Sequence, residues 1–185
     1  MSATIKINRI TGPGAGSGVD ITNLKTRSNT IDTHSTNDTT SPIQVPSSGV
    51  SFSYWVTTRL NAIITPAGTI NNLKWYTDGA NNFGTGVTCK CAKASTGANA
   101  GYRQAIGTIG TTGTQLTTSD HTGLDELPAN AFGFTSGSPK SLSGSISNPD
   151  TGLFGDHLVH QIEVDSTAGP GATTSESFVW KFDET

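Results

Sequence analysis

A long stretch of alternating apolar and polar residues constrains the fold of this chain more than any other feature. Within residues 50–64 the even positions are apolar, apart from Thr58, and the odd positions are mostly polar. Successive side chains of a β-strand point to opposite faces of a sheet, so this period of two predicts a long strand with one buried face. The apolar positions are Val50, Phe52, Tyr54, Val56, Leu60, Ala62 and Ile64.

Other segments repeat this pattern over shorter lengths, and Gly, Ser, Thr, Asn and Pro turns separate them. The additional expected strands are residues 4–10, 69–77, 85–94, 140–147, 157–165 and 176–182, with a hairpin in 107–118 and one helical turn in 120–130. No segment shows a sustained helical period. Strand centres spaced by roughly ten residues are typical of two packed antiparallel sheets. We therefore predict an all-β fold, a two-sheet sandwich of jelly-roll or immunoglobulin-like type.

The segment of residues 23–49 differs from the rest because it is polar and poor in large apolar side chains. It holds only Leu24, Ile31, Ile43 and Val45. Such a segment cannot recover its ordering entropy from a core of its own. We therefore expect residues 1–49 to form an N-terminal strand and an extended arm or loop, and residues 50–185 to form the β-sandwich domain. Because a structureless run of this length is uncommon inside a compact domain, the arm is expected to lie on a partner or a neighbouring subunit.

The distribution of charge argues against several classes of partner. The chain has 11 basic and 14 acidic residues, for a net charge of -3, and its basic residues form no run. A protein that binds nucleic acid usually presents a basic patch to the phosphates, so none is expected as a partner. No apolar run reaches the length of a membrane span, and the first residues contain no hydrophobic signal core. Synthesis in a cytoplasm, without membrane association, is the expectation.

Two cysteines, Cys89 and Cys91, are separated by one residue. On a strand they project from the same face about 6.5–7 Å apart, which is too far for an easy disulfide. Two ligands do not make a zinc site, and no other pair completes one. We predict reduced thiols that point into the core.

The histidines do not form a complete catalytic arrangement in the sequence. His157 and His160 lie three residues apart, so on a strand they point to opposite faces and cannot share a metal ion. An enzyme would require His121 or His157 to meet a carboxylate and a nucleophile across loops. The sequence therefore predicts a chain without enzymatic activity and without a cofactor.

Two groups of oxygen-bearing side chains could in principle bind calcium. They are Asp78 with Asn81 and Asn82, and Asp120 with Asp125 and Glu126. Neither group has the spacing of an EF-hand loop. Because Asp and Asn are also common turn residues, we interpret both groups as turns and predict no metal site.

Aromatic residues supply the candidate contact site. Trp55 falls on the polar face of the long strand, beside Arg59. An exposed Trp next to an Arg is typical of an interface anchor or of a platform that stacks on sugars, although the arm or a second sheet could also cover it. Trp55, Arg59 and Tyr76 are thus the possible interface or ligand contacts. A carbohydrate-binding module of a tail or surface adhesin is the alternative to a protein interface. In such a module Trp55, Tyr76 or Tyr102 would stack on sugar rings.

Four segments give the chain a family likeness. They are Ser53-Tyr54-Trp55-Val56, Leu73-Lys74-Trp75-Tyr76-Thr77-Asp78-Gly79, residues 143–149 and residues 173–185. Over residues 50–185 the chain resembles small all-β virion proteins of tailed bacteriophages, notably capsid decoration or cement proteins. No functional residue is carried across by this resemblance.

The resemblance implies a non-enzymatic structural protein that is made in the host cytoplasm and displayed on the virion. It implies the major capsid protein or other virion proteins as partners, together with a homo-oligomer or lattice neighbours. The contacts would be made by the arm and by sheet edges, through strand addition and apolar packing.

Overall fold

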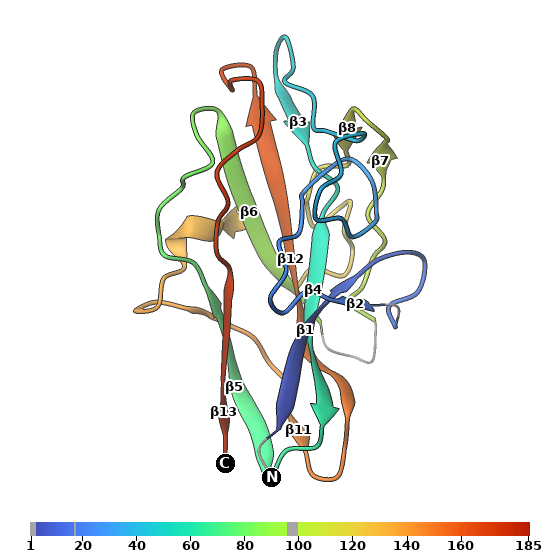
Figure 1. Ribbon diagram of the computed structural model, residues 1–185, viewed down its shortest axis with the longest axis vertical. Coiled ribbons are helices and arrows are strands. Elements are labelled where there is room, and N and C mark those ends of the chain that lie inside the picture. The colour runs from blue at the N-terminus through green and yellow to red at the C-terminus, as the bar shows by residue number, and fades with distance from the viewer. Residues whose placement is uncertain (1–2, 17, 96–99) are drawn as a thin grey trace.

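Antiparallel strands form almost all of the regular structure in the computed structural model, which describes residues 3–16, 18–95 and 100–185 (Figure 1). The strands are β1 (Thr4–Ile10), β2 (Gly18–Asp20), β3 (Val50–Phe52), β4 (Val56–Ile64), β5 (Thr69–Tyr76), β6 (Val87–Ala94), β7 (Gly107–Thr108), β8 (Thr112–Gly113), β9 (Ala129–Asn130), β10 (Lys140–Ser141), β11 (Ile146–Ser147), β12 (Gly152–Asp165) and β13 (Val179–Glu184). A single turn of 3-10 helix, η2 (Ala131–Gly133), follows β9. The all-β prediction is confirmed.

The strands assemble into two main sheets and one small hairpin. The larger, sheet A, has the order β2-β1-β4-β12-β6-β9, and β3 also pairs with β12. In the smaller, sheet B, β5 pairs with β10 and β11 on one side and with β13 on the other. The expected hairpin is present as β7 and β8. Sheets A and B share one core, which is the arrangement of a sandwich.

The core between the sheets comes from alternate residues of the strands, as the period of two predicts. Leu60 on β4, Leu73 and Trp75 on β5, and Leu158 on β12 are at most 1% exposed. Trp180 and Phe182 on β13 pack against the same core and are half-buried. Burial of these large side chains provides the main favourable free energy that holds the two sheets together.

Cys89 and Cys91 lie side by side in this core on β6. Both are free thiols with no exposed surface, which confirms the prediction of reduced, inward-pointing cysteines. Burial raises the pKa of both thiols, to about 12 for Cys91. Thiols protonated in this way are poor nucleophiles, so they act as small apolar side chains.

The other face of sheet A is also covered. Trp55, Leu116 and Val159 belong to a second apolar cluster there, with Tyr54, Ala94 and Ala105. In consequence β12 is buried on both faces from Phe154 to Ile162. Sheet A is therefore the middle layer, between sheet B and a layer of connecting segments.

Two of the expected strands are broken in the structure. The long strand of residues 50–64 is divided into β3 and β4, because Tyr54 N donates to Asn29 O (2.7 Å) rather than to a neighbouring strand. The strand of residues 140–147 is divided into β10 and β11, where Ser143 N donates to the carboxylate of Asp156 (2.6 Å). In both places a partner distant in sequence takes the backbone group that would have continued the ladder.

Gln161, on β12, holds the backbone next to the first of these breaks, at Ser53. Its side chain is 0% exposed, and its Nε2 donates to Ser53 O (2.6 Å) and to Thr114 O (2.8 Å). Its Oε1 accepts a hydrogen bond from Leu116 N (2.6 Å). One buried amide therefore satisfies three backbone groups that regular structure leaves unpaired.

The substitution Gln161→Leu tests this role. It preserves the size of the side chain but leaves Ser53 O, Thr114 O and Leu116 N buried without their partner. Each such loss costs about 1–3 kcal/mol, so we expect the free energy of unfolding to fall by about 3–5 kcal/mol in urea denaturation. Gln44→Leu is the matched control, because the side chain of Gln44 makes one exposed hydrogen bond, to Gly110 O. An equal loss in both variants would contradict the role of Gln161.

Gly155 produces a second constraint, at a break in the register of β12 with β4 between Phe154 and Leu158. Its φ of 74° lies in the left-handed region, and an added Cβ would meet Leu73 Cδ1 at 2.3 Å. Its carbonyl accepts a hydrogen bond from Arg59 Nε (2.7 Å). Backbone conformation and packing thus both require glycine at this position.

Replacement of Gly155 by alanine is therefore expected to lower the free energy of unfolding by about 2–4 kcal/mol, from a strained φ and an overpacked core. Gly169→Ala is the matched control, because Gly169 has an ordinary φ and nothing within 4 Å of the added atom. Thermal and urea unfolding of the two variants provide the measurement. A Gly155→Ala variant as stable as the control would show that this contact is not limiting.

The N-terminal part of the chain is continuous with the sandwich. β1 pairs with β4 along seven residues, from Thr4 to Ile10, so it is an integral strand of sheet A. Within residues 23–49, Thr30 N donates to Ser41 O (2.9 Å) and Gln44 N donates to Thr111 O (3.3 Å). An extended arm is thus not clearly shown, because this segment turns back on itself and lies against the domain (Figure 1).

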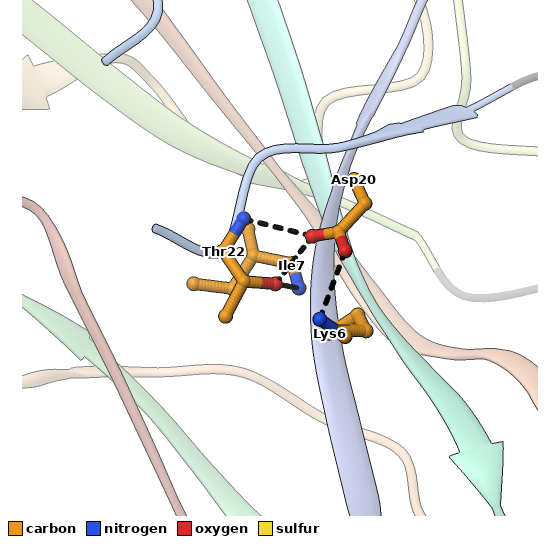
Figure 2. Close-up of polar contacts among 4 residues, drawn as sticks. All are labelled: Lys6, Ile7, Asp20 and Thr22. Atoms are coloured by element: carbon orange, nitrogen blue, oxygen red, sulfur yellow. Dashed lines mark hydrogen bonds and ion pairs between the residues drawn. The ribbon is translucent and has the colours of Figure 1, made fainter. Parts of the chain in front are cut away.

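A small polar cluster anchors the start of that segment to β1 (Figure 2). Asp20 accepts hydrogen bonds from the backbone N (2.9 Å) and the hydroxyl (2.6 Å) of Thr22, and it pairs with Lys6 Nζ at 3.0 Å. The same hydroxyl accepts a hydrogen bond from Ile7 N (2.9 Å). The bonds from Thr22 and the nearby ammonium lower the pKa of Asp20 to about 2. This turn directs the chain after β2 back across sheet A.

Candidate interaction surface

Two of the three contact residues expected from the sequence are buried. Trp55 is 3% exposed, and its Nε1 donates to Arg103 O (3.1 Å) while its ring lies 5.2 Å from that of His121. Arg59 is 6% exposed. Neither side chain is therefore available as an exposed contact in this structure. Trp55 packs with Ala105 and Leu116, which lie between β6 and β9.

The remaining aromatic candidates differ in their surroundings. Tyr76, at the end of β5, is half-buried and pairs with Val179 of β13. Tyr102 is 7% exposed, and its hydroxyl donates to Gly12 O (2.7 Å). Burial raises the pKa of Tyr102. Of the three rings considered for sugar stacking, only that of Tyr76 retains appreciable exposure.

Three histidines lie inside the protein. His157 packs against Tyr102, with ring centroids 6.1 Å apart, whereas His160 packs against Phe178, at 5.0 Å. These neighbours lie on opposite faces of sheet A, which confirms that the two histidines cannot share a metal ion. Burial lowers the pKa of His121 and His157 to about 4 and that of His160 to about 3. All three rings are neutral near pH 7 and belong to the packed interior.

Buried neutral histidines make the stability of the protein depend on pH. A histidine in the unfolded chain titrates near its ordinary pKa of 6.5, so between about pH 6.5 and 4 the unfolded state binds more protons than the folded state. Stability is therefore complete above about pH 6.5 and is lost as the pH falls, by about 1.4 kcal/mol for each unit of pKa shift. Urea denaturation at a series of pH values should show this loss before most carboxylates titrate.

The variant His157→Gln should make this pH dependence shallower, because it removes one of the buried titrating rings. His34→Gln is the matched control, since His34 is only partly buried. The comparison concerns the slope of stability against pH, not the absolute stability of each variant. A slope unchanged by His157→Gln but reduced by His34→Gln would contradict the assignment.

The oxygen-bearing side chains considered for calcium are used in local hydrogen bonds. Asp78 accepts from Ala80 N (2.9 Å), and Asn81 Oδ1 accepts from Phe83 N (3.2 Å), as expected for turn residues. Asp120 accepts from the hydroxyl of Thr117 (2.6 Å). Among the residues that the structure describes, no group of three or more His, Cys, Asp or Glu side chains is placed to hold a metal ion.

Glu126 instead pairs with a lysine that the sequence analysis did not single out. Lys140 is 6% exposed; its Nζ pairs with the carboxylate of Glu126 and lies 4.3 Å from the centroid of the Phe134 ring. Glu126 also accepts a hydrogen bond from Lys93 N (2.9 Å). The pair connects β10 to the edge of sheet A. No local pattern marks Lys140 as buried, because its neighbours in sequence are Pro139 and Ser141.

Five of the large exposed aliphatic side chains in the described part of the chain lie toward the two ends of the molecule, and the others are Val19, Leu24, Val50 and Leu127. At one end, Val45, Ile106 and Ile109 are 41%, 57% and 65% exposed, and we call them the hairpin patch. They belong together because Gln44 bonds to the backbone of Gly110 and Thr111, at the β7–β8 turn. At the other end, Ile63 and Ile64 are 53% and 46% exposed, and we call them the β4-end patch. Figure 1 shows β7–β8 and the end of β4 toward opposite ends of the long axis.

A shallow groove lies close to the β4-end patch. It has a volume of about 420 Å³ and is lined by Ser145, Ile146, Ser147, Asp150, Thr151, Leu153 and Phe154. The register of sheet A places it there, because Leu153 pairs with Asn61, two residues before Ile63. The end of the molecule that carries the β4-end patch thus combines exposed aliphatic side chains with a polar groove.

The C-terminal strand β13 forms one edge of sheet B. Among the described strands it pairs only with β5, so its other side faces no strand. Lys181 and Asp183 point away from the core, and a register shift lies between them. Charges and bulges on an edge strand reduce unselective pairing with other chains, so any partner of this edge must match it.

Comparison with known proteins adds no relative. No family model matches the chain, no curated protein is similar to it, and no solved structure resembles it. In the described part of the chain, no helix is long and apolar enough to cross a bilayer.

Proposed function

We propose that this chain is a non-enzymatic structural protein of a virion, which decorates or cements a bacteriophage capsid by joining neighbouring capsid subunits. The resemblance of residues 50–185 to phage decoration proteins supports the type of particle. The placement of exposed side chains supports the manner of contact, because a cementing protein has to hold two neighbours at once.

The observation that carries the proposal is the placement of exposed aliphatic side chains at opposite ends of an elongated sandwich. Ile109, at 65% exposure, and Ile63, at 53%, are large apolar groups that a soluble surface does not require. Two small apolar patches rather than one large one favour two modest contacts. On a lattice, many such contacts act together, so each can be weak while the whole shell is strengthened.

The edge of β13 offers a third contact, of a different kind. Its unpaired side can receive an extended strand of a capsid subunit, with backbone hydrogen bonds supplying the affinity. The charges of Lys181 and Asp183 would then select the partner. The proposed partners are the major capsid protein or other virion proteins, and neighbouring copies of this chain.

Carbohydrate binding is not proposed, because Trp55 and Tyr102 are buried and leave Tyr76 without a second stacking partner. Catalysis is not proposed either. The buried histidines are surrounded mainly by aromatic rings, and none has a nucleophile and a carboxylate arranged beside it among the described residues.

The test is binding of the purified protein to phage particles from the source that encodes it, measured by co-sedimentation and by the heat resistance of the particles. We expect the natural protein to sediment with particles and to raise the temperature at which they release DNA. Ile109→Ser and Ile63→Ser should each weaken binding several-fold, and the double variant should lose the stabilisation of the particle, because it holds neither neighbour.

Leu127→Ser is the matched control. Leu127 is 76% exposed but belongs to neither patch, so its loss should leave particle binding unchanged. Circular dichroism and thermal melting of all variants establish that the fold is retained. If the protein is absent from purified particles and does not bind to them, the proposed function is wrong. If all three substitutions act alike, the two-ended mode of contact is wrong.

A further inference from the structure

Arg9, on β1, is a buried cation with unused hydrogen-bond donors. Its side chain is 1% exposed. Nη1 donates to Thr26 Oγ1 (2.8 Å) and to Arg27 O (2.9 Å). Nε and Nη2 are buried and meet no acceptor among the described residues. A guanidinium buried in this way has two unsatisfied donor nitrogens and a charge without a partner at contact distance, which is costly unless an acceptor of negative charge is close by.

None of the described residues supplies that negative charge at contact distance. The ion pairs of the described residues are Lys6 with Asp20 and Lys140 with Glu126, and neither includes Arg9. Asp32 is near enough to affect the pKa of Arg9, but its Oδ2 accepts a hydrogen bond from Gly12 N (2.8 Å). Burial is the larger effect and lowers the pKa of Arg9 to about 10.

Basic groups lie near Arg9 on its own face of sheet A, in addition to the acidic Asp32 and Tyr102, whose charges raise its pKa. Arg9 pairs with Thr58, which pairs with Leu158, so the guanidinium starts from the same face of sheet A as the inter-sheet core. His160 is on this face too, and its Nδ1 is buried without a partner. Burial and the charge of Arg9 both lower the pKa of His160 and of His34. Arg9, His160 and the half-buried His34 thus form a group of basic side chains in which burial is the dominant effect on the pKa of each.

We propose that Arg9 is the centre of a binding site for a small monovalent anion of the halide type, held by its Nε and Nη2 under the segment that carries Thr26 and Arg27. An anion satisfies both donors and the charge, whereas a water molecule satisfies the donors alone. A small ion is required because Arg9 is 1% exposed, its Nε and Nη2 are buried, and Thr26 and Arg27 already occupy its Nη1.

The site has a structural consequence for residues 23–49. The same guanidinium that holds the anion also holds Thr26 and Arg27, and Thr26 Oγ1 in turn lies 3.2 Å from His34 Nδ1. Binding of the anion stabilises the extended, ordered side chain of Arg9 and therefore the docking of this segment on the sandwich. Anion binding and the order of residues 23–49 are coupled in this way.

The test uses chloride and bromide on the full chain. At constant total sodium salt, chloride is exchanged for gluconate, which is too large for a buried site. We expect the melting temperature to rise with chloride and, above the dissociation constant, the ratio of folded to unfolded protein to rise about tenfold for each tenfold increase in chloride. Limited proteolysis within residues 23–49 should slow in parallel. Crystals grown in bromide should show an anomalous peak beside Arg9.

Arg9→Met removes the donors and the charge while keeping much of the length of the side chain, and it should abolish both the chloride dependence and the peak. Lys181→Met is the control, because it removes an exposed cation from β13, which among the described strands does not contact residues 23–49 through a strand pairing. Should Arg9→Met fail to fold, the wild-type bromide crystals and the chloride series still decide the matter. Any of three results would overturn the proposal. They are stability independent of chloride, an anomalous peak elsewhere, or a peak beside Arg9 without any effect on stability, which means binding at crystal concentration only.

Discussion

The side chain of Gln161 is the point at which three separate parts of the chain meet inside the protein. In the described sheets, β12 pairs with both β4 and β6 and is buried on both faces. A polar side chain on β12 therefore has to find its hydrogen-bond partners inside the protein. The amide of Gln161 does this for itself and for the backbone of Ser53, Thr114 and Leu116. In doing so it bends the chain between β3 and β4 and seats the layer that covers Trp55. The burial of Trp55 follows from this hydrogen bonding, and with it the absence of an aromatic contact surface.

The interior of this protein contains many polar side chains beside the apolar ones. Only 32% of its residues are apolar, yet sheet A has to be covered on both faces. The chain meets this demand by burying polar and charged side chains beside aliphatic ones, among them Arg9, Thr57, His157 and Gln161. Each of these needs partners or neutrality, which explains why so many covering segments are held by side-chain hydrogen bonds rather than by strands.

The local pattern of the sequence predicted those parts of the fold that depend on alternation alone. Strand β1 was expected at residues 4–10, where it occurs, and β5 was expected within one residue of its observed end. The breaks at Ser53–Trp55 and between β10 and β11 could not be predicted, because they depend on Asn29, Gln161 and Asp156, which are distant in sequence.

The candidate surface was less predictable than the fold. Trp55 lies on the face expected for it, but whether that face is open depends on residues 103–121, whose path has no local signal. Likewise, the alternation that places Ile64 with the apolar positions gives no indication that β4 runs past the end of the core and leaves this side chain exposed. Exposure is a property of the assembled sheets, and for Ile63, Ile106 and Ile109 it had to be taken from the structure.

The pairing of β4 with β12 also determines when this chain can fold. Thr58 and Leu158, which face each other across these strands, are separated by 100 residues. On the ribosome, the edge of β4 that β12 will occupy therefore stays unpaired until about 100 further residues have been made. Contacts of such long range form slowly, and an apolar strand waiting for its neighbour can pair instead with the same strand of another nascent chain. At high levels of synthesis, the pairing of β4 with the later-made β12 thus competes with aggregation through β4.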